Sequence, residues 1–330
     1  MVEGLRRTLV IVAVAFTLAG AAAAVALWPR PEARPVVLSR PLTLGPLEIR
    51  SPDGIASVAY SPDGRTLVTA GQQGLRLWDP VAGNEIRRLV DGKGPMTAVA
   101  FAPDGRSVIS GHESGAVQRW DATTGAQLAA FASATEAVRS LVFAPDGRTL
   151  AGGTGESIQL WDVGSGRALR TLNHVPYRFK SPPVFSADGR RIGRAVEKFN
   201  VWDVATGSLV EQRSFKPYVN VAALGPDGAT WAVGGLKDLW LVDPDNVEPR
   251  KLIGHEFEIT AIAFAPDGHT LASGGDFYDR SVRLWDVRSG RQIRVLCERC
   301  GHFHQVLFGP DGRTVVAASE PPNMLLVWRL

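Results

Sequence analysis

The chain has 330 residues, of which 45% are hydrophobic and 21% charged, and this composition excludes a largely disordered protein. Its two cysteines exclude a fold held together by several disulfides. The formal net charge of +3 lies entirely in residues 1–41, which hold five arginines and two glutamates. The rest of the chain is neutral overall and lacks the clustered positive charge of a nucleic-acid-binding protein, so we expect no nucleic-acid partner.

The chain begins with a segment typical of export or membrane anchoring. Arg6 and Arg7 precede the uncharged run Thr8–Trp28, which is long enough as a helix to span a bilayer of about 30 Å. Small residues at its end also fit a cleaved signal peptide. Both alternatives place the following residues outside the cytoplasm. We therefore divide the chain into a signal anchor or signal peptide (1–28), a Pro/Arg-rich linker (29–41) and a folded domain (42–330).

One tetrapeptide ending in Asp-Gly recurs seven times at intervals of 39 to 44 residues in the folded domain. Six copies read x-Pro-Asp-Gly and the fourth reads Ser-Ala-Asp-Gly. Pro presets φ at the first turn position, Asp bonds the local backbone and Gly accepts a positive φ, so each copy predicts a tight turn. Alternating apolar residues on both sides predict paired strands. The aspartates are Asp63, Asp104, Asp146, Asp188, Asp227, Asp267 and Asp311.

A tryptophan follows each of these turns at the end of another apolar stretch. In five repeats it is followed by Asp, the fifth repeat has the degenerate Trp240-Leu241-Val242-Asp243, and the last ends at Trp328-Arg329. Four strands in roughly 40 residues, repeated seven times with no helical stretch, predict an all-β propeller. The five intact pairs are Trp78-Asp79, Trp120-Asp121, Trp161-Asp162, Trp202-Asp203 and Trp285-Asp286.

Together these motifs resemble the WD-repeat family. The resemblance implies a seven-bladed β-propeller with four antiparallel strands in each blade. The last repeat has no fourth strand of its own, which would leave an unpaired sheet edge. We therefore expect Leu42–Arg50 to lie beside Leu325–Trp328 and close the ring. A closed ring needs no partner to cover its edges, so we expect a monomer.

The family resemblance also implies a hydrogen-bond network within the sixth repeat. His255, Ser273, Asp279 and Trp285 match the histidine, serine or threonine, aspartate and tryptophan that hold the loops of such blades together. A Ser-His-Asp set could also suggest a hydrolase. We favour the structural role, because these residue types at these places match an internal network.

The segment from Cys297 to His304 is the most unusual local sequence. Cys297 and Cys300, with His302 and His304, could bind zinc, form a disulfide, remain thiols or act as a redox pair. In an exported protein the disulfide is the simplest of these alternatives, and the spacing is too short for the usual structural zinc pattern. We predict no metal and no cofactor.

A basic, aromatic and proline-rich loop in the fourth repeat is the best candidate for a binding surface. Loops at this place lie at the mouth of the central channel of a propeller, and these residue types commonly anchor interfaces. Arg194 stands where other repeats have small residues, so it needs an acidic partner such as Glu197, or a ligand. Phe277-Tyr278 in the sixth repeat add to the same face. The loop residues are His174, Tyr177, Arg178, Phe179 and Lys180.

The sequence thus predicts a non-catalytic scaffold that binds a protein or peptide and is tethered to a membrane or exported. A rigid ring with variable loops suits this role. The alternatives are an exported propeller enzyme similar to lactonases or quinone-dependent dehydrogenases, and a periplasmic propeller of an envelope complex. An enzyme would need converging polar ligands at the channel mouth, and the corresponding positions vary as Gln, Ser, Gly, Val and Pro.

Overall fold

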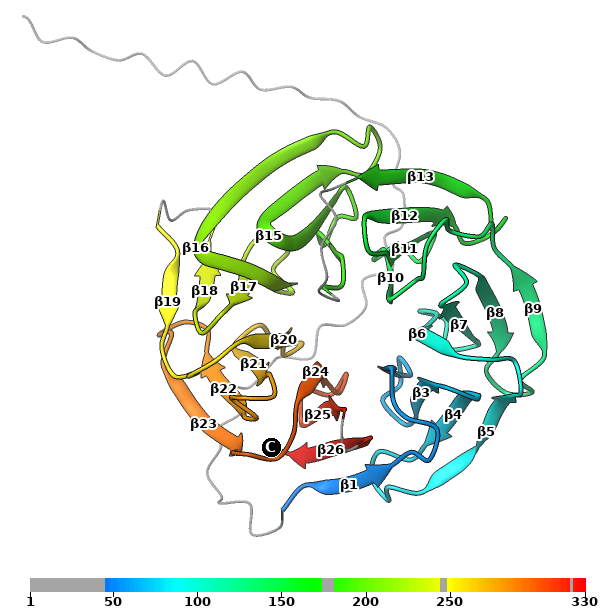
Figure 1. The fold of residues 1–330 in the computed structure, drawn as a ribbon, viewed down its shortest axis with the longest axis horizontal. Helices are drawn as coiled ribbons and strands as arrows, with labels where there is room; N and C mark the ends of the chain where they lie inside the picture. Colours follow the sequence, from blue (N-terminus) through cyan, green and yellow to red (C-terminus); the bar gives the residue numbers. More distant parts are fainter. Residues whose placement is uncertain (1–44, 174–180, 244–247, 321–322) are drawn as a thin grey trace, which may run out of the picture. The chain divides into compact units, whose positions relative to one another are not determined.

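The structure, a computed structural model, describes residues 45–173, 181–243, 248–320 and 323–330. These residues form 26 strands and contain no helix. The strands make up six antiparallel sheets that follow one another around a ring (Figure 1). The all-β propeller is therefore confirmed. No helix in the described part of the chain is long and apolar enough to cross a bilayer. The predicted segment Thr8–Trp28 and the linker lie outside the described residues.

Five of the sheets are blades of four strands, and in four of these the strands follow one another in chain order. The first blade consists of β2 (Ser57–Tyr60), β3 (Leu67–Gly71), β4 (Gly74–Trp78) and β5 (Glu85–Asp91). The second consists of β6 (Met96–Phe101), β7 (Ser107–His112), β8 (Val117–Asp121) and β9 (Gln127–Ala130). The third consists of β10 (Ser140–Phe143), β11 (Thr149–Gly153), β12 (Ser157–Asp162) and β13 (Ala168–Asn173).

The fourth and fifth repeats share one sheet of six strands, in the order β14 to β19. The prediction of seven separate four-stranded blades is therefore wrong: the structure has five, and this larger sheet. The strands are β14 (Val184–Phe185), β15 (Arg191–Asp203), β16 (Leu209–Leu224), β17 (Trp231–Gly235), β18 (Leu239–Val242) and β19 (Arg250–Leu252).

The two repeats share one sheet because no turn interrupts their long strands. Strand β16 pairs with β15 through its first half and with β17 through its second half, and Glu197 of β15 also pairs with Val219. No glycine interrupts β16, so the strand passes from one repeat to the next without a turn. Strand β15 likewise continues through Glu197, which takes a positive φ of 57° where other repeats have a loop.

The last blade is completed by the segment that precedes the first repeat. Strands β24 (Phe303–Phe308), β25 (Thr314–Ser319) and β26 (Met324–Arg329) are joined by β1 (Leu47–Arg50), which pairs with β26 from Leu47↔Val327 to Arg50↔Met324. Figure 1 shows the two ends of the domain side by side. The predicted ring closure is thus confirmed for Leu47–Arg50, whereas residues 42–44 lie outside the described part.

The inner strands of the last and first blades are also joined. The Gln305 side chain accepts a hydrogen bond from Val58 N at 3.0 Å and donates one to Val58 O at 2.8 Å. This amide pairs with the backbone of the neighbouring strand as another backbone residue would. Two contacts therefore close the ring: the pairing of β1 with β26 on the outside, and the hydrogen bonds between Gln305 and Val58 on the inner strands.

The repeated motifs make the turns that the sequence predicts. In the first blade, Gly64 N donates to Ser61 O at 2.9 Å and Gly64 has a φ of 71°. The Asp63 carboxylate accepts from Ser61 Oγ at 2.6 Å and Arg65 N at 3.1 Å. After Trp78, the Asp79 carboxylate accepts from the next backbone amides, and these hydrogen bonds lower its pKa. Both aspartates are therefore explained by the turns they stabilise.

The seven Asp-Gly turns touch one another around the ring. The position of a Cβ on each turn glycine would lie against the proline of the preceding turn, for example 3.3 Å from Pro310 Cδ at Gly64 and 3.1 Å from Pro226 Cγ at Gly268. The fourth turn has Ala187 in place of proline, and the following glycine, Gly228, makes the tightest of these approaches, 2.5 Å from Ala187 Cβ. A side chain at Gly228 would meet this neighbour.

The hydrophobic core lies between neighbouring sheets. One cluster joins Val68, Leu75 and Leu77 of the first blade to Val99 and Trp120 of the second, and each of these side chains is at most 6% exposed. The remaining blade, β20 (Ile259–Phe264), β21 (Thr270–Gly275), β22 (Val282–Asp286) and β23 (Gln292–Cys297), packs on both neighbours in the same way. Apolar burial between sheets, at about 25 cal/mol per Å², is therefore the main force that holds the ring together.

We expect Gly228→Ala to lower the free energy of unfolding by about 3 kcal/mol, because a positive φ is strained for alanine and the new methyl group meets Ala187. Gly290→Ala is the matched control: Gly290 has a φ of 70°, but no heavy atom lies within 4 Å of its Cβ position. This control should cost about 1 kcal/mol. If urea unfolding shows that both variants lose the same free energy of unfolding, the contact between the turns does not contribute to stability.

Candidate functional site

The sixth repeat contains a buried hydrogen-bond chain that links four separate segments. His255, in the loop between β19 and β20, contacts Ser273 Oγ through Nε2 at 2.6 Å. Trp285 Nε1 donates to the same hydroxyl at 2.8 Å. On the other side of the imidazole ring, Nδ1 lies 2.9 Å from Asp279 Oδ1. The structure thus brings together all four residues that the sequence singled out.

Asp279 is the centre of this network. Its carboxylate accepts hydrogen bonds from Glu256 N at 2.9 Å, Ser281 N at 3.2 Å and Ser281 Oγ. Burial opposes its ionisation, but hydrogen bonds from His255 and Ser281, together with the His255 charge, outweigh that cost and hold the pKa of Asp279 well below its usual range. The carboxylate therefore fastens the widened β21–β22 loop to the loop that enters β20.

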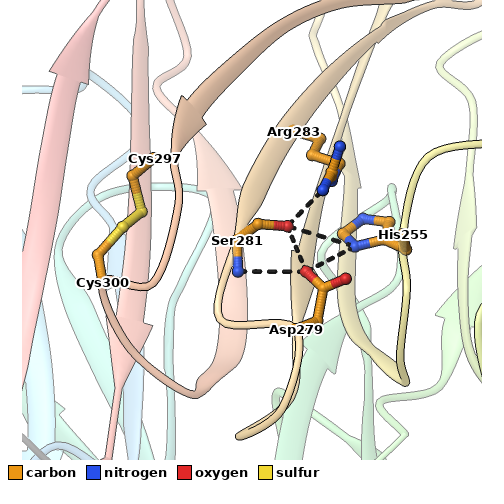
Figure 2. Close-up of a disulfide and its surroundings, with 6 residues drawn as sticks. All are labelled: His255, Asp279, Ser281, Arg283, Cys297 and Cys300. Carbon is orange, nitrogen blue, oxygen red and sulfur yellow. Dashed lines mark hydrogen bonds and ion pairs between the residues drawn. A yellow bond between two sulfur atoms is a disulfide. The ribbon is translucent and has the colours of Figure 1, made fainter.

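Further hydrogen bonds extend the network to the outer strand. Arg283 Nε donates to Ser281 Oγ at 3.0 Å, and its guanidinium reaches Gln292 of β23 at 2.8 Å. Figure 2 shows the interactions that join Ser281 to Asp279, His255 and Arg283, and the disulfide between the end of β23 and the loop that follows it. The loop is thus held from its base on several sides.

Cys297 and Cys300 are joined by a disulfide in the structure (Figure 2), with Cα atoms 6.2 Å apart. Cys300 N donates to Arg280 O at 3.1 Å, so the disulfide loop contacts the widened β21–β22 loop. His302, just before β24 (Phe303–Phe308), and His304, within it, are partly buried. In the described part of the chain, no group of three or more His, Cys, Asp or Glu side chains is suited to holding a metal ion.

The Ser-His-Asp geometry does not favour a hydrolase. Ser273 is fully buried, His255 is 6% exposed, and the Asp279 side chain is 1% exposed. A nucleophilic serine must meet its substrate, but the Ser273 hydroxyl lies beneath the blade surface and already accepts the Trp285 N–H. This arrangement suits a network that holds loops in place.

The widened β21–β22 loop, which Asp279 holds in place, presents aromatic side chains to solvent. Phe277 is 60% exposed, Tyr278 is 70% exposed, and Phe257 of the facing loop is 45% exposed. The rings of Phe257 and Tyr278 have centroids 5.6 Å apart, and those of Phe277 and Tyr278 lie 5.7 Å apart edge to face. We call these three residues the aromatic patch. Contiguous exposed rings of this kind commonly mark interaction surfaces.

Arg194 is buried in β15, at 1% exposure. Its guanidinium donates to the carbonyl oxygens of Ser181 at 2.9 Å, Ser157 at 3.0 Å and Thr154 at 2.8 Å. Burial lowers the pKa of Arg194 to about 10, and the charge of Glu136 opposes this shift. The sequence pointed to Glu197 as its partner, but Glu197 is exposed. Arg194 therefore ties the third blade to the chain that enters the fourth repeat.

The other predicted binding residues lie outside the described residues, and their role stays a prediction. They are His174, Tyr177, Arg178, Phe179 and Lys180.

The second blade contains a partial copy of the network that was not predicted from the sequence. Trp120 Nε1 donates to Ser110 Oγ at 2.8 Å, and the same hydroxyl lies 3.0 Å from His112 Nε2. Burial lowers the pKa of His112, while a hydrogen bond with Gln118 opposes the shift. This histidine comes from the end of β7 and not from the entry loop. Its position two residues after Ser110, on the same side of the strand, was the available signal.

An additional Ser-Pro-Asp-Gly sequence, at Ser51–Gly54, was also missed as a separate feature. It lies at the entry to the first blade, where Asp53 pairs with buried Arg76 at 2.5 Å. Arg76 also pairs with Glu85 at 2.6 Å. Arg76 holds the same place before the Trp-Asp pair as Arg283 in the sixth repeat, so both arginines link an inner loop to an outer strand.

Comparison with known proteins agrees with this architecture. The WD40 family model (WD domain, G-beta repeat) matches residues 47–79, 83–121, 125–162 and 247–286. The ring of antiparallel blades defines a β-propeller, and four of its repeats are similar to the WD repeat.

Known relatives share the repeats over limited lengths. The chain is 35% identical over 77 residues to the WD repeat-containing protein sll1491 of Synechocystis, covering 23% of this chain and 21% of that protein. It is 27% identical over 142 residues to a guanine nucleotide-binding protein subunit beta of Arabidopsis thaliana, covering 39% and 37%. The matched region thus spans less than half of these relatives.

A solved structure, hydrazine synthase of Kuenenia stuttgartiensis, has a TM-score of 0.73 at 18% identity. The match covers 86% of this chain and 97% of that chain. At this identity the likeness shows the fold alone.

We expect Asp279→Asn to lower the free energy of unfolding at neutral pH by about 3 kcal/mol, because an amide leaves buried donors poorly paired. Glu256→Gln, an exposed change in the loop to which Asp279 is fastened, is the control. The folded-state pKa of Asp279 is depressed, so its contribution is complete above the unfolded value near 4 and is lost as pH falls further. Thermal unfolding measured from pH 7 to pH 3 should show the stabilities of the unaltered protein and Asp279→Asn converge as the pH falls. A stability difference that stays constant would contradict the role given to the ionised Asp279.

We expect Arg194→Met to lower stability by about 3 kcal/mol, since three buried carbonyl oxygens lose a charged donor. Arg190→Met, at an exposed arginine in the turn before β15, should change stability by less than about 0.5 kcal/mol. Urea unfolding of the two variants is the measurement, and similar small effects would show that Arg194 does not join the two repeats.

Proposed function

We propose that this protein is a non-catalytic platform that binds a protein or peptide through the inner loops of the propeller, with the aromatic patch as part of the binding surface. One observation carries the proposal: Phe277 and Tyr278 are largely exposed on a loop that is fastened from beneath by buried Asp279. Large aromatic side chains on a rigid support are the usual anchors of protein interfaces.

The fastened loop favours binding energetically. Ordering a flexible loop on binding costs free energy, and a loop held by His255, Ser281 and the disulfide-linked turn has little freedom left to lose. The network therefore gives a reason for the sixth repeat to keep four buried polar residues. It holds an exposed apolar surface in one arrangement.

We extend this proposal to an assembly of seven repeat units, with the fourth and fifth sharing one sheet. The seven Asp-Gly turns support it, because each lies against the one before and the first lies against the last. The apolar run Thr8–Trp28 supports a location outside the cytoplasm, either tethered by that segment or released after its cleavage. The closed ring supports a monomer.

The enzyme alternatives have no comparable support. The likeness to hydrazine synthase concerns the fold alone at 18% identity, and one fold hosts many unrelated functions. Ser273 and His255 are also buried, so a substrate could not reach them.

A peptide-display selection on the full-length chain in detergent tests the binding function. We expect enriched peptides to bind the double variant Phe277→Ser/Tyr278→Ser at least about tenfold more weakly, because two interface anchors are lost. Val81→Ser is the matched control: Val81 is 62% exposed in a turn on the opposite face of the ring, and its loss should leave binding unchanged. Failure to enrich any peptide, or equal binding to the double variant, would overturn the proposal. Unaltered melting temperatures would show that the variants are folded.

A further inference from the structure

Two acidic residues lie beside the aromatic patch. Glu258 directly follows Phe257, and Asp276 directly precedes Phe277. The backbone joins their loops, since Asp276 N donates to Glu258 O at 2.8 Å. Neither carboxylate forms an ion pair within the described part of the chain. Two neighbouring negative charges without a cation are costly, and they call for a reason.

A buried side chain from the preceding repeat adds an unpaired oxygen at the same place. Asn220, in the second half of β16, is 3% exposed, and its Nδ2 donates to Glu258 Oε1. Its Oδ1 is buried without a hydrogen-bond partner. Both atoms are bonded to one carbon, so this free acceptor lies next to the Glu258 carboxylate. Rotating the amide would bring oxygen against oxygen, so Glu258 fixes its orientation.

Other repeats show what this position does when it is structural. Thr97 and Thr260 also lie seven residues before the aspartate of their Asp-Gly turns, and each donates its hydroxyl to a backbone carbonyl of the next blade. Asn220 also reaches the next blade, through the hydrogen bond from its Nδ2 to Glu258, but its Oδ1 stays without a partner. Joining the blades therefore accounts for the amide nitrogen and not for the oxygen.

The electrostatics agree that the place is rich in negative charge. Burial raises the pKa of Glu258, and the charge of Asp276 raises it further, against the hydrogen bond from Asn220. Burial also raises the pKa of Tyr218, and the charges of Glu258 and Asp276 add to this shift. Tyr218 lies two residues before Asn220 in β16. Acceptor oxygens from three segments thus converge there.

We infer that Glu258, Asp276 and Asn220 form, with the aromatic patch, a subsite for an arginine side chain of the bound peptide. A guanidinium group is planar and positively charged and carries five N–H donors, so it can pair with carboxylate and amide oxygens. It also stacks on aromatic rings, which Phe257 and Tyr278 provide. An ammonium group offers fewer donors and stacks less well, so lysine should bind more weakly.

The inference rests on the proposed function and specifies which residue of the bound peptide is recognised. A metal ion is a poorer occupant, because only two acidic residues meet here and no metal-binding cluster occurs among the described residues. An arginine supplies the missing charge and the missing donor together. The subsite would thus select which peptides the aromatic patch retains.

Two pools of random nonapeptides test the subsite. The central residue is arginine in one pool and its neutral isostere citrulline in the other. The pools are otherwise identical, and their peptides contain no other charged residue. We expect immobilised full-length protein in detergent to retain the arginine pool about tenfold better. The variant Glu258→Gln/Asp276→Asn should lose this preference, and asparagine at 276 keeps the oxygen that caps Tyr278 N and Asp279 N. Glu113→Gln, in the corresponding exposed loop of the second blade, should keep it.

Equal retention of the two pools by the unaltered protein, at any level, overturns the arginine subsite, as does a preference that survives in the acidic double variant. The single variant Glu258→Gln provides the same reading if the double variant unfolds. If the pools are equal but both are lost on Phe277→Ser/Tyr278→Ser, the binding function stands without the subsite. If that variant retains both pools as the unaltered protein does, the proposed function fails as well.

Discussion

The pairing of β1 with β26 is the constraint on which the rest of the ring depends. Strand β26 is almost wholly apolar, with Leu325, Leu326 and Val327 all buried, and without β1 its outer edge would expose unpaired backbone groups. Ile49 of β1 covers this edge at 1% exposure. Because each sheet packs its faces on two neighbours, opening this junction would expose apolar surface on both sides of it. The loops that carry the proposed binding surface keep their relative positions only while the ring is closed.

The sequence predicted the parts of the fold that are set by local chemistry. An Asp-Gly turn needs only its own residues, and the turn at Gly64 forms as expected. The junction of the fourth and fifth repeats depends on how two strands meet in space. Strand β16 contains Pro217 and no glycine, and nothing in its residues alone says that its two halves pair with different strands of one sheet. The separate blades predicted there were therefore wrong.

The candidate site divides in the same way. His255 and Asp279 could be predicted because a family pattern fixes their spacing. Asn220 could not, because its importance comes from Glu258, 38 residues further along the chain and in the next repeat. The corresponding position holds threonine in only two repeats, so no regular pattern marks Asn220, and the residue gains meaning only when the contact across the blades is seen. Residues that act between repeats thus escape an analysis made repeat by repeat.

The buried network and the unpaired carboxylates make opposite contributions to stability at neighbouring places. Asp279 has donors for its oxygens and lies against His255, so its charge is compensated inside the protein. Glu258 and Asp276 have hydrogen bonds but no compensating cation, and burial makes ionisation of Glu258 less favourable. A protein under selection for stability alone would gain from neutralising that pair. The two carboxylates lie on loops that the first network holds together, an arrangement that fits the proposed cation from a bound peptide, and the aromatic patch marks the side from which this cation would arrive.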